Sequence, residues 1–317
     1  MTSQEALQRP NRKWRRKMGV VAATGCLAIG GLNFAAAPAN AQDSNCADVV
    51  GIGVPGTNEG QAHHPGKIDN DSIYGPKVAD MIEAAAQTLP SFEAHAINYR
   101  ATGLGGVGNW NAAAAKLAYN ASEYKVSKDE GYNLAYQTLA SYADSCKKST
   151  KFILFGYSQG AHIAGDLTNS IFNGNGPIGS DRLAASALLA DPAFNRVIKE
   201  AGVTGRSALY QYNGPPPTSS DFDPSDDTVF STVGRGWNVR GSLGKREAYP
   251  AGAPVLSACI VGDPVCDLNS VGLGGINAKE AAEKSWYHGL YTDVNFQDTS
   301  ATLATFVGKA AAGMAKG

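Results

Sequence analysis

The stretch Lys151–Gly160, KFILFGYSQG, decides the fold of this chain, because a short apolar run ends there in a tight glycine turn. The run 152–155 is too short for a helix of its own and predicts a buried strand. Residues 161–171 have one apolar side and predict a helix directly after the turn. A Gly-x-Ser-x-Gly sequence between a strand and a helix lifts the serine hydroxyl clear of the sheet, and its glycines keep Cβ atoms out of the bend. Ser158 is therefore a candidate nucleophile, with an ordinary glycine turn as the alternative.

Other candidate strands and helices alternate along the chain and predict an α/β fold with a central, mostly parallel sheet flanked by helices. We expect strands at 48–54, 92–99, 184–190, 207–212 and 255–261, and helices at 71–89 and 128–146. Residues 213–254 break this alternation with prolines, aspartates and glycines, which predicts a lid-like insertion. We interpret its aspartates as a helix start or a solvated turn rather than a calcium site; they are Asp221, Asp223, Asp226 and Asp227.

The first 41 residues differ in composition from the rest. A basic segment, 12–17, leads into the apolar stretch 20–37 and then Ala39-Asn40-Ala41. This order is typical of a signal peptide cleaved after Ala41 and predicts a protein that is secreted or held at the cell envelope. A retained membrane anchor, a lipoprotein modified at Cys26 and a twin-arginine export signal in the basic segment are the alternatives.

Charge and length limit what the exported part can be. Residues 42–317 carry 21 basic and 27 acidic side chains, so their net charge is near −6. A mildly acidic chain is not suited to binding nucleic acid through bulk charge. The length fits one α/β domain with an insertion, and 43% hydrophobic residues over the full chain allow a substantial core.

Four cysteines follow the leader: Cys46, Cys146, Cys259 and Cys266. An even number in an exported chain predicts two disulfides, with three possible pairings. A local Cys259–Cys266 bridge is the simplest choice, and it leaves Cys46 to pair with Cys146. That second bridge would close a loop of about 100 residues, which the chain-entropy model values at roughly 4 to 5 kcal/mol. The spacing contains no Cys-x-x-Cys pair, which disfavours a zinc site.

A serine nucleophile needs a base to take its proton and an acid to orient that base. In the chain order serine, acid, histidine, His288 is the only histidine far enough downstream of Ser158. Asp191 and Asp263 both follow predicted strands. We expect Asp263 to be the acid, since a bridge across 259–266 would fix its loop, and Asp191 is the alternative.

Two further clusters are interpreted as ordinary loops. The polar set His63, His64, Asp69 and Asp71 is too irregular for a metal site. The glycine-rich stretch 103–111 lacks phosphate-loop spacing and is expected to lie on the rim of the site. The turn 55–60, after the first strand, is where an oxyanion donor belongs. The chain is thus predicted to need no metal and no cofactor.

These features resemble the cutinase-like serine esterases of the α/β-hydrolase fold over most of the chain after the leader. The motifs that carry the resemblance are GYSQGA at 156–161, the cysteine-framed 259–266 loop, and His288 with Tyr287 and Tyr291. Because Gly56-Thr57 matches the oxyanion segment of that family, the resemblance implies Thr57 and the backbone N–H of Gln159 as oxyanion donors. Arg100 departs from the family, since relatives commonly have proline there.

The chain is more similar to exported actinobacterial members, which are associated with lipid and cell-envelope esters. The resemblance implies a secreted carboxylic-ester hydrolase that forms an acyl-enzyme on lipid or envelope acyl esters, mycolate-type esters included, with peripheral association to the envelope. Two alternatives use the same scaffold. One is a mycoloyl-type acyltransferase that passes the acyl group to a sugar or protein hydroxyl, and the other is a non-catalytic envelope-binding protein.

Overall fold

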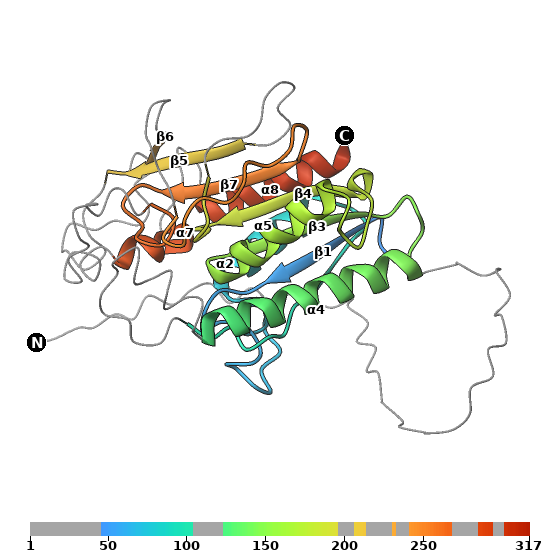
Figure 1. The fold of residues 1–317 in the computed structure, drawn as a ribbon, viewed down its shortest axis with the longest axis horizontal. Coiled ribbons are helices and arrows are strands. Elements are labelled where there is room, and N and C mark those ends of the chain that lie inside the picture. The colour runs from blue at the N-terminus through green and yellow to red at the C-terminus, as the bar shows by residue number, and fades with distance from the viewer. Residues whose placement is uncertain are drawn as a thin grey trace, which may run out of the picture. The chain divides into compact units, whose positions relative to one another are not determined.

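The strand that ends in the glycine turn is β3 (Lys151–Tyr157), which lies inside a seven-stranded sheet of order β2-β1-β3-β4-β7-β5-β6. A computed structural model describes residues 46–103, 123–195, 206–213, 230–232, 241–267, 285–293 and 301–317. The other strands are β1 (Val49–Val54), β2 (Phe92–Ala96), β4 (Leu183–Leu189), β5 (Arg206–Tyr212), β6 (Phe230–Thr232) and β7 (Val255–Ile260). Neighbouring strands pair in parallel except β6, which pairs antiparallel with β5 (Figure 1). The predicted α/β fold with a mostly parallel sheet is confirmed.

Helices cover both faces of the sheet (Figure 1). On one face, α2 (Pro76–Thr88) and α8 (Leu303–Lys316) bury apolar side chains against Ile153 and Phe155. On the other face, α4 (Glu123–Ser145) and α5 (Gln159–Phe172) pack over Phe152 and Leu154. Successive β3 side chains point to opposite faces, so the uninterrupted apolar run of β3 supplies both cores.

The predicted helix 71–89 is wrong as one helix, because Gly75 and Pro76 divide it. Helix α1 (Asn70–Tyr74) begins at the Asp69 N-cap and ends at Gly75, whose φ is 76°. Helix α2 then begins with Pro76, which suits a first helical position because it lacks an N–H. The apolar spacing continues through this break, and periodicity alone therefore did not reveal it.

Three predicted boundaries also shift. The strand expected at 92–99 ends at Ala96, and α4 begins five residues before the predicted position 128. The helix after the glycine turn begins at Gln159 rather than after Gly160. This last shift places the backbone N–H of Gln159 in the first helical turn, where N–H groups have no partner within the helix.

The predicted insertion 213–254 is described at residues 213, 230–232 and 241–254, and there it contributes to the folded body. Strand β6 extends the sheet, and Tyr249 is 2% exposed in the core beneath α5. Part of residues 241–254 therefore packs on the folded body. The four aspartates of this segment, the leader 1–41 and the stretch 104–111 lie outside the described residues.

Two disulfides tie loops to the sheet. Cys46 bonds to Cys146 just after α4, and Cys259 at the end of β7 bonds to Cys266. Both pairings are those expected from the spacing. No helix in the described part of the chain is long and apolar enough to cross a membrane.

Candidate active site

The turn after β3 holds Ser158 in a strained conformation with φ 53° and ψ −118°. Two close approaches explain the glycines around it. A Cβ on Gly160 would lie 2.0 Å from the carbonyl oxygen of Val54, and one on Gly156 would lie 2.5 Å from the carbonyl oxygen of Gly160. A larger residue at 160 would push the turn away from β1, and one at 156 would push the start of α5 away from β3. The strain and the glycines are the features of a nucleophile elbow.

Three predicted side chains meet above the carboxyl ends of the strands. His288, in the short 3-10 helix η3 (Ser285–His288), places Nε2 3.1 Å from Ser158 Oγ. Its Nδ1 lies 2.9 and 3.0 Å from the two carboxylate oxygens of Asp263, which follows β7. Asp263 is fully buried, whereas the side chain of His288 is 23% exposed. This geometry lets the imidazole take a proton from the serine while the carboxylate holds its other nitrogen.

The loop that carries Asp263 is fixed by several bonds besides its disulfide. Val265 N–H donates to Asp263 Oδ1 at 2.9 Å, and the hydroxyl of Tyr291 in α7 (Leu290–Asp293) donates to Oδ2 at 2.9 Å. The same hydroxyl oxygen accepts the N–H of Ile260 at 3.1 Å. Burial, followed by the nearby carboxylate, raises the pKa of Tyr291 well above its usual value, so the phenol stays protonated and remains a donor.

Tyr157, the residue before the serine, holds the histidine segment in place. Its hydroxyl donates to the carbonyl oxygen of His288 at 2.7 Å, and its ring stacks on the imidazole with centroids 4.9 Å apart. Burial raises the pKa of Tyr157 well above the ordinary phenol value. The sequence prediction did not include this residue, although it stands inside the glycine motif.

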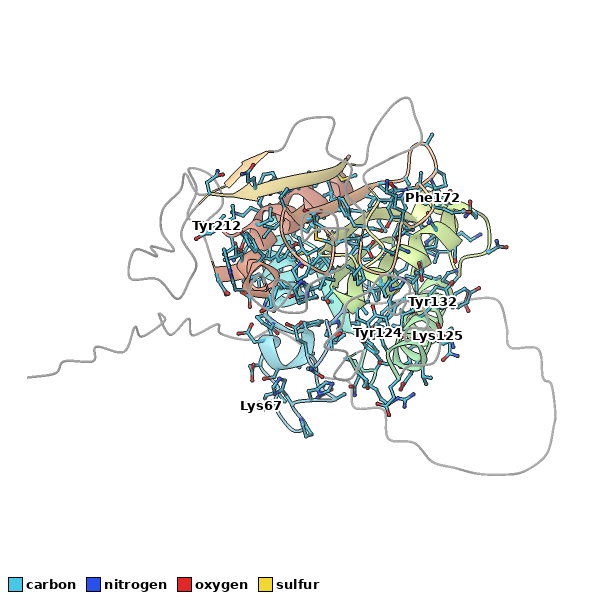
Figure 2. The ribbon with its side chains drawn as sticks, turned by 60° about the vertical axis from the view of Figure 1, so that its left-hand side comes forward. Lys67, Tyr124, Lys125, Tyr132, Phe172 and Tyr212 are labelled. Atoms are coloured by element: carbon cyan, nitrogen blue, oxygen red, sulfur yellow. A yellow bond between two sulfur atoms is a disulfide. The ribbon has the colours of Figure 1, made fainter. Side chains whose placement is uncertain are left out.

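The two predicted oxyanion donors lie on segments that meet at the elbow. Thr57 follows β1, and a Cβ on Gly160 would also lie 2.6 Å from the carbonyl oxygen of Pro55, which shows how closely that loop approaches α5. Gln159 is fully buried, and its side-chain Nε2 donates to the carbonyl oxygens of Thr102, at 3.1 Å, and Tyr124, at 3.3 Å. Tyr124, labelled in Figure 2, lies in the first turn of α4.

Comparison with known proteins identifies the family. Residues 70–278, about two thirds of the chain, match the protein family described as Cutinase. The chain belongs to the cutinase family. A member of this family is a carboxylic-ester hydrolase, and the resemblance noted in the sequence is confirmed at the level of the family.

The chain is also similar, more distantly, to several solved structures. The catalytic core domain of acetyl xylan esterase from Trichoderma reesei is 20% identical, covering 77% of this chain and 98% of that chain at a TM-score of 0.43. A cutinase-like protein from Cryptococcus sp. is 19% identical, covering 86% and 98% of the two chains at a TM-score of 0.42. No curated protein matches the chain significantly.

The alternative acid, Asp191, has other contacts in the structure. Its buried carboxylate lies 3.0 Å from Nη2 of Arg246, which also contacts Asp166 and donates to the carbonyl oxygen of His162. Burial raises the pKa of Asp191 although Arg246 opposes that rise. Asp191 therefore ties Arg246 to the segment after β4, and it is Asp263 that contacts His288.

The remaining histidines have other neighbours. His162 lies 3.2 Å from the Tyr124 hydroxyl, and burial lowers its pKa to about 3. The ring of His95 contacts Tyr142, and His63 Nε2 lies 2.7 Å from the carbonyl oxygen of Arg100. Within the described ranges, no group of three or more His, Cys, Asp or Glu side chains is placed to hold a metal ion. Asp69, from the polar loop, caps α1.

Proposed function

We propose that the chain is a secreted serine esterase that works through an acyl-enzyme. Ser158 Oγ attacks the ester carbonyl carbon while His288 Nε2 takes the hydroxyl proton, and Asp263 holds the Nδ1 side of the ring. Thr57 and the Gln159 N–H stabilise the negative charge on the carbonyl oxygen. The alcohol leaves with the proton from His288, and water then attacks the acyl-enzyme by the same route. The 3.1 Å contact between Ser158 Oγ and His288 Nε2 is the observation that carries this proposal.

The substrate we propose is a lipid or cell-envelope acyl ester. The resemblance to exported actinobacterial members supports this class.

Export is part of the same proposal. The leader 1–41 has the order of a signal peptide, and two disulfides are typical of proteins that fold in an oxidising compartment. We propose that the protein acts outside the cytoplasm, with peripheral contact to the envelope. Sequencing the N-terminus of the protein from the culture medium and the envelope fraction tests this, and a start at Gln42 is expected.

The catalytic test compares the native protein with Ser158→Ala on a short-chain nitrophenyl ester. The loss of rate is expected to be on the order of 10⁴-fold or more, because the nucleophile and its base act as a unit. Ser141→Ala, an exposed position on α4, is the matched control and should keep full activity. A fluorophosphonate should label the native and control proteins only. Equal hydrolysis by the native and Ser158→Ala proteins would refute the mechanism.

The substrate test uses nitrophenyl esters of increasing acyl length, followed by product analysis with and without a sugar acceptor. Release of free acid from long-chain esters at a kcat/KM above that for acetate is the expected result. If most of the acyl group is transferred to the sugar rather than to water, the protein is an acyltransferase and the hydrolase proposal is wrong.

A further inference from the structure

Two hydrogen bonds between Gly56 and Glu59 close the turn that carries Thr57. The N–H of Glu59 donates to the carbonyl oxygen of Gly56 at 3.1 Å, and the N–H of Gly56 donates to Glu59 Oε2, also at 3.1 Å. These bonds run in opposite directions between the same two residues. Thr57 and Asn58 are therefore held between two fixed points, and Asn58 is fixed again by its N–H bond to the carbonyl oxygen of Ala101 at 2.8 Å.

Gly56 is packed between the Glu59 carboxylate and the ring of Tyr157. A Cβ on Gly56 would lie 2.6 Å from Tyr157 Cδ1 and 3.0 Å from Glu59 Oε2. A Cβ on Gly75, between α1 and α2, would lie 2.3 Å from the same carboxylate oxygen. The Glu59 carboxylate thus lies in a space that is open because residues 56 and 75 are both glycines. A displaced carboxylate would no longer hold the Gly56 N–H.

A cation completes this group. Lys77 Nζ lies 3.9 Å from Glu59 Oε1 and 5.3 Å from the centre of the Tyr157 ring, and both members of the ion pair are largely buried. Tyr157 in turn stacks on His288 and donates to its carbonyl oxygen. The Glu59 carboxylate therefore touches the turn on one side and, through Lys77 and Tyr157, the histidine segment on the other.

Burial of an acid at this place opposes folding unless the acid has a specific partner. Burial raises the pKa of Glu59 above its usual value, against the effects of Lys77 and of the Gly56 N–H. A short polar side chain would close a surface turn without that penalty. Compared with such a short side chain, glutamate adds the hydrogen bond from the Gly56 N–H to its carboxylate.

We propose that Glu59 is a positioning residue for the oxyanion turn. Its Oε2 holds the Gly56 N–H and so fixes the Pro55–Gly56 peptide, which directly precedes the peptide that joins Gly56 to Thr57. This proposal rests on the proposed function, because it takes Thr57 as an oxyanion donor. A donor that is misplaced loses stabilisation of the tetrahedral state, while binding of the planar ester is unaffected.

Two conservative variants separate the hydrogen bond from the charge. Glu59→Gln keeps an acceptor oxygen at full length, whereas Glu59→Asp keeps the charge but withdraws the oxygen by one methylene group. We expect kcat of Glu59→Asp to fall on the order of tenfold to a hundredfold, and kcat of Glu59→Gln to stay within about threefold of native, with KM unchanged in both. The Ki of an alkylboronic acid, which forms a tetrahedral adduct on the serine, should rise with the fall in kcat.

Glu83→Gln is the control, since Glu83 is a carboxylate on α2 whose contact is with Asn70 rather than the turn. All rates are divided by the concentration of sites that react with a fluorophosphonate, and thermal unfolding is recorded for each protein. A Glu59→Asp variant that is as active as Glu59→Gln, or that loses only thermal stability, would overturn the proposal. An active Ser158→Ala protein would instead overturn the proposed function, whatever the Glu59 variants do.

Discussion

Replacing Arg246 by methionine should destabilise this enzyme far more than the same substitution at an exposed arginine. The Arg246 side chain is 3% exposed, and its Nη2 lies 3.1 and 3.0 Å from the two oxygens of Asp191 and 3.1 Å from the carbonyl oxygen of His162. Methionine fills most of the volume but donates nothing. The Asp191 carboxylate, 1% exposed, would keep only the Ala193 N–H as a donor among these contacts.

The expected loss follows from leaving one charge of a buried pair without its partner. Removing one partner of such a pair costs about 3 to 5 kcal/mol. At roughly 2 to 4 °C per kcal/mol for a domain of this size, the Tm should fall by about 10 °C. Asp166 is affected less, because Lys128 Nζ remains 2.6 Å from its Oδ2.

The loss should also depend on pH. Burial already raises the pKa of Asp191 in the native protein, and without Arg246 nothing comparable opposes that effect. An acid whose pKa is higher in the folded state stabilises the fold only while it is protonated, so stability is lost as pH rises from the unfolded value through the folded one. The Tm deficit of Arg246→Met should therefore be larger at pH 7.5 than at pH 5.

Circular dichroism melting curves at both pH values measure this effect. Arg100→Met is the matched control, because the Arg100 side chain is 57% exposed in its pair with Glu130, and its Tm should equal the native Tm. Adding Asp191→Asn to Arg246→Met removes the unpaired charge and should recover part of the lost Tm. If Arg246→Met has the same Tm as the Arg100→Met control at both pH values, the buried pair does not stabilise the fold.

Two other substitutions address the acid loop. Tyr291→Phe removes the 2.9 Å bond to Asp263 and should lower kcat about tenfold at constant KM. An unchanged kcat would contradict this role. Replacing both cysteines of the Cys259–Cys266 bridge by serine should lower kcat and change Tm little. Replacing both cysteines of the Cys46–Cys146 bridge should lower Tm and change kcat little. Melting curves and rates per reactive site measure both effects.

The sequence was sufficient to predict the fold class, both disulfide pairings and the meeting of Ser158, Asp263 and His288. These depend on signals that are local or unique: one glycine turn, one short cysteine loop and one downstream histidine. The supporting contacts could not be predicted in this way. Tyr157 and His288 are 131 residues apart, and Glu59 looked like any polar residue of a turn. Their roles depend on which strand ends lie side by side, and residue type and spacing do not encode that.

The choice between Asp191 and Asp263 shows what strand order adds. Both aspartates follow parallel strands, but β4 neighbours β3 directly, whereas β7 lies one strand further away. The line from Ser158 Oγ to the carboxylate includes hydrogen bonds of 3.1 and 2.9 Å and the width of an imidazole ring. That length exceeds one strand spacing of about 4.8 Å and approaches two. A carboxylate after β7 therefore suits the far side of His288, whereas the Asp191 carboxylate, after β4, contacts Arg246 and the Ala193 N–H instead.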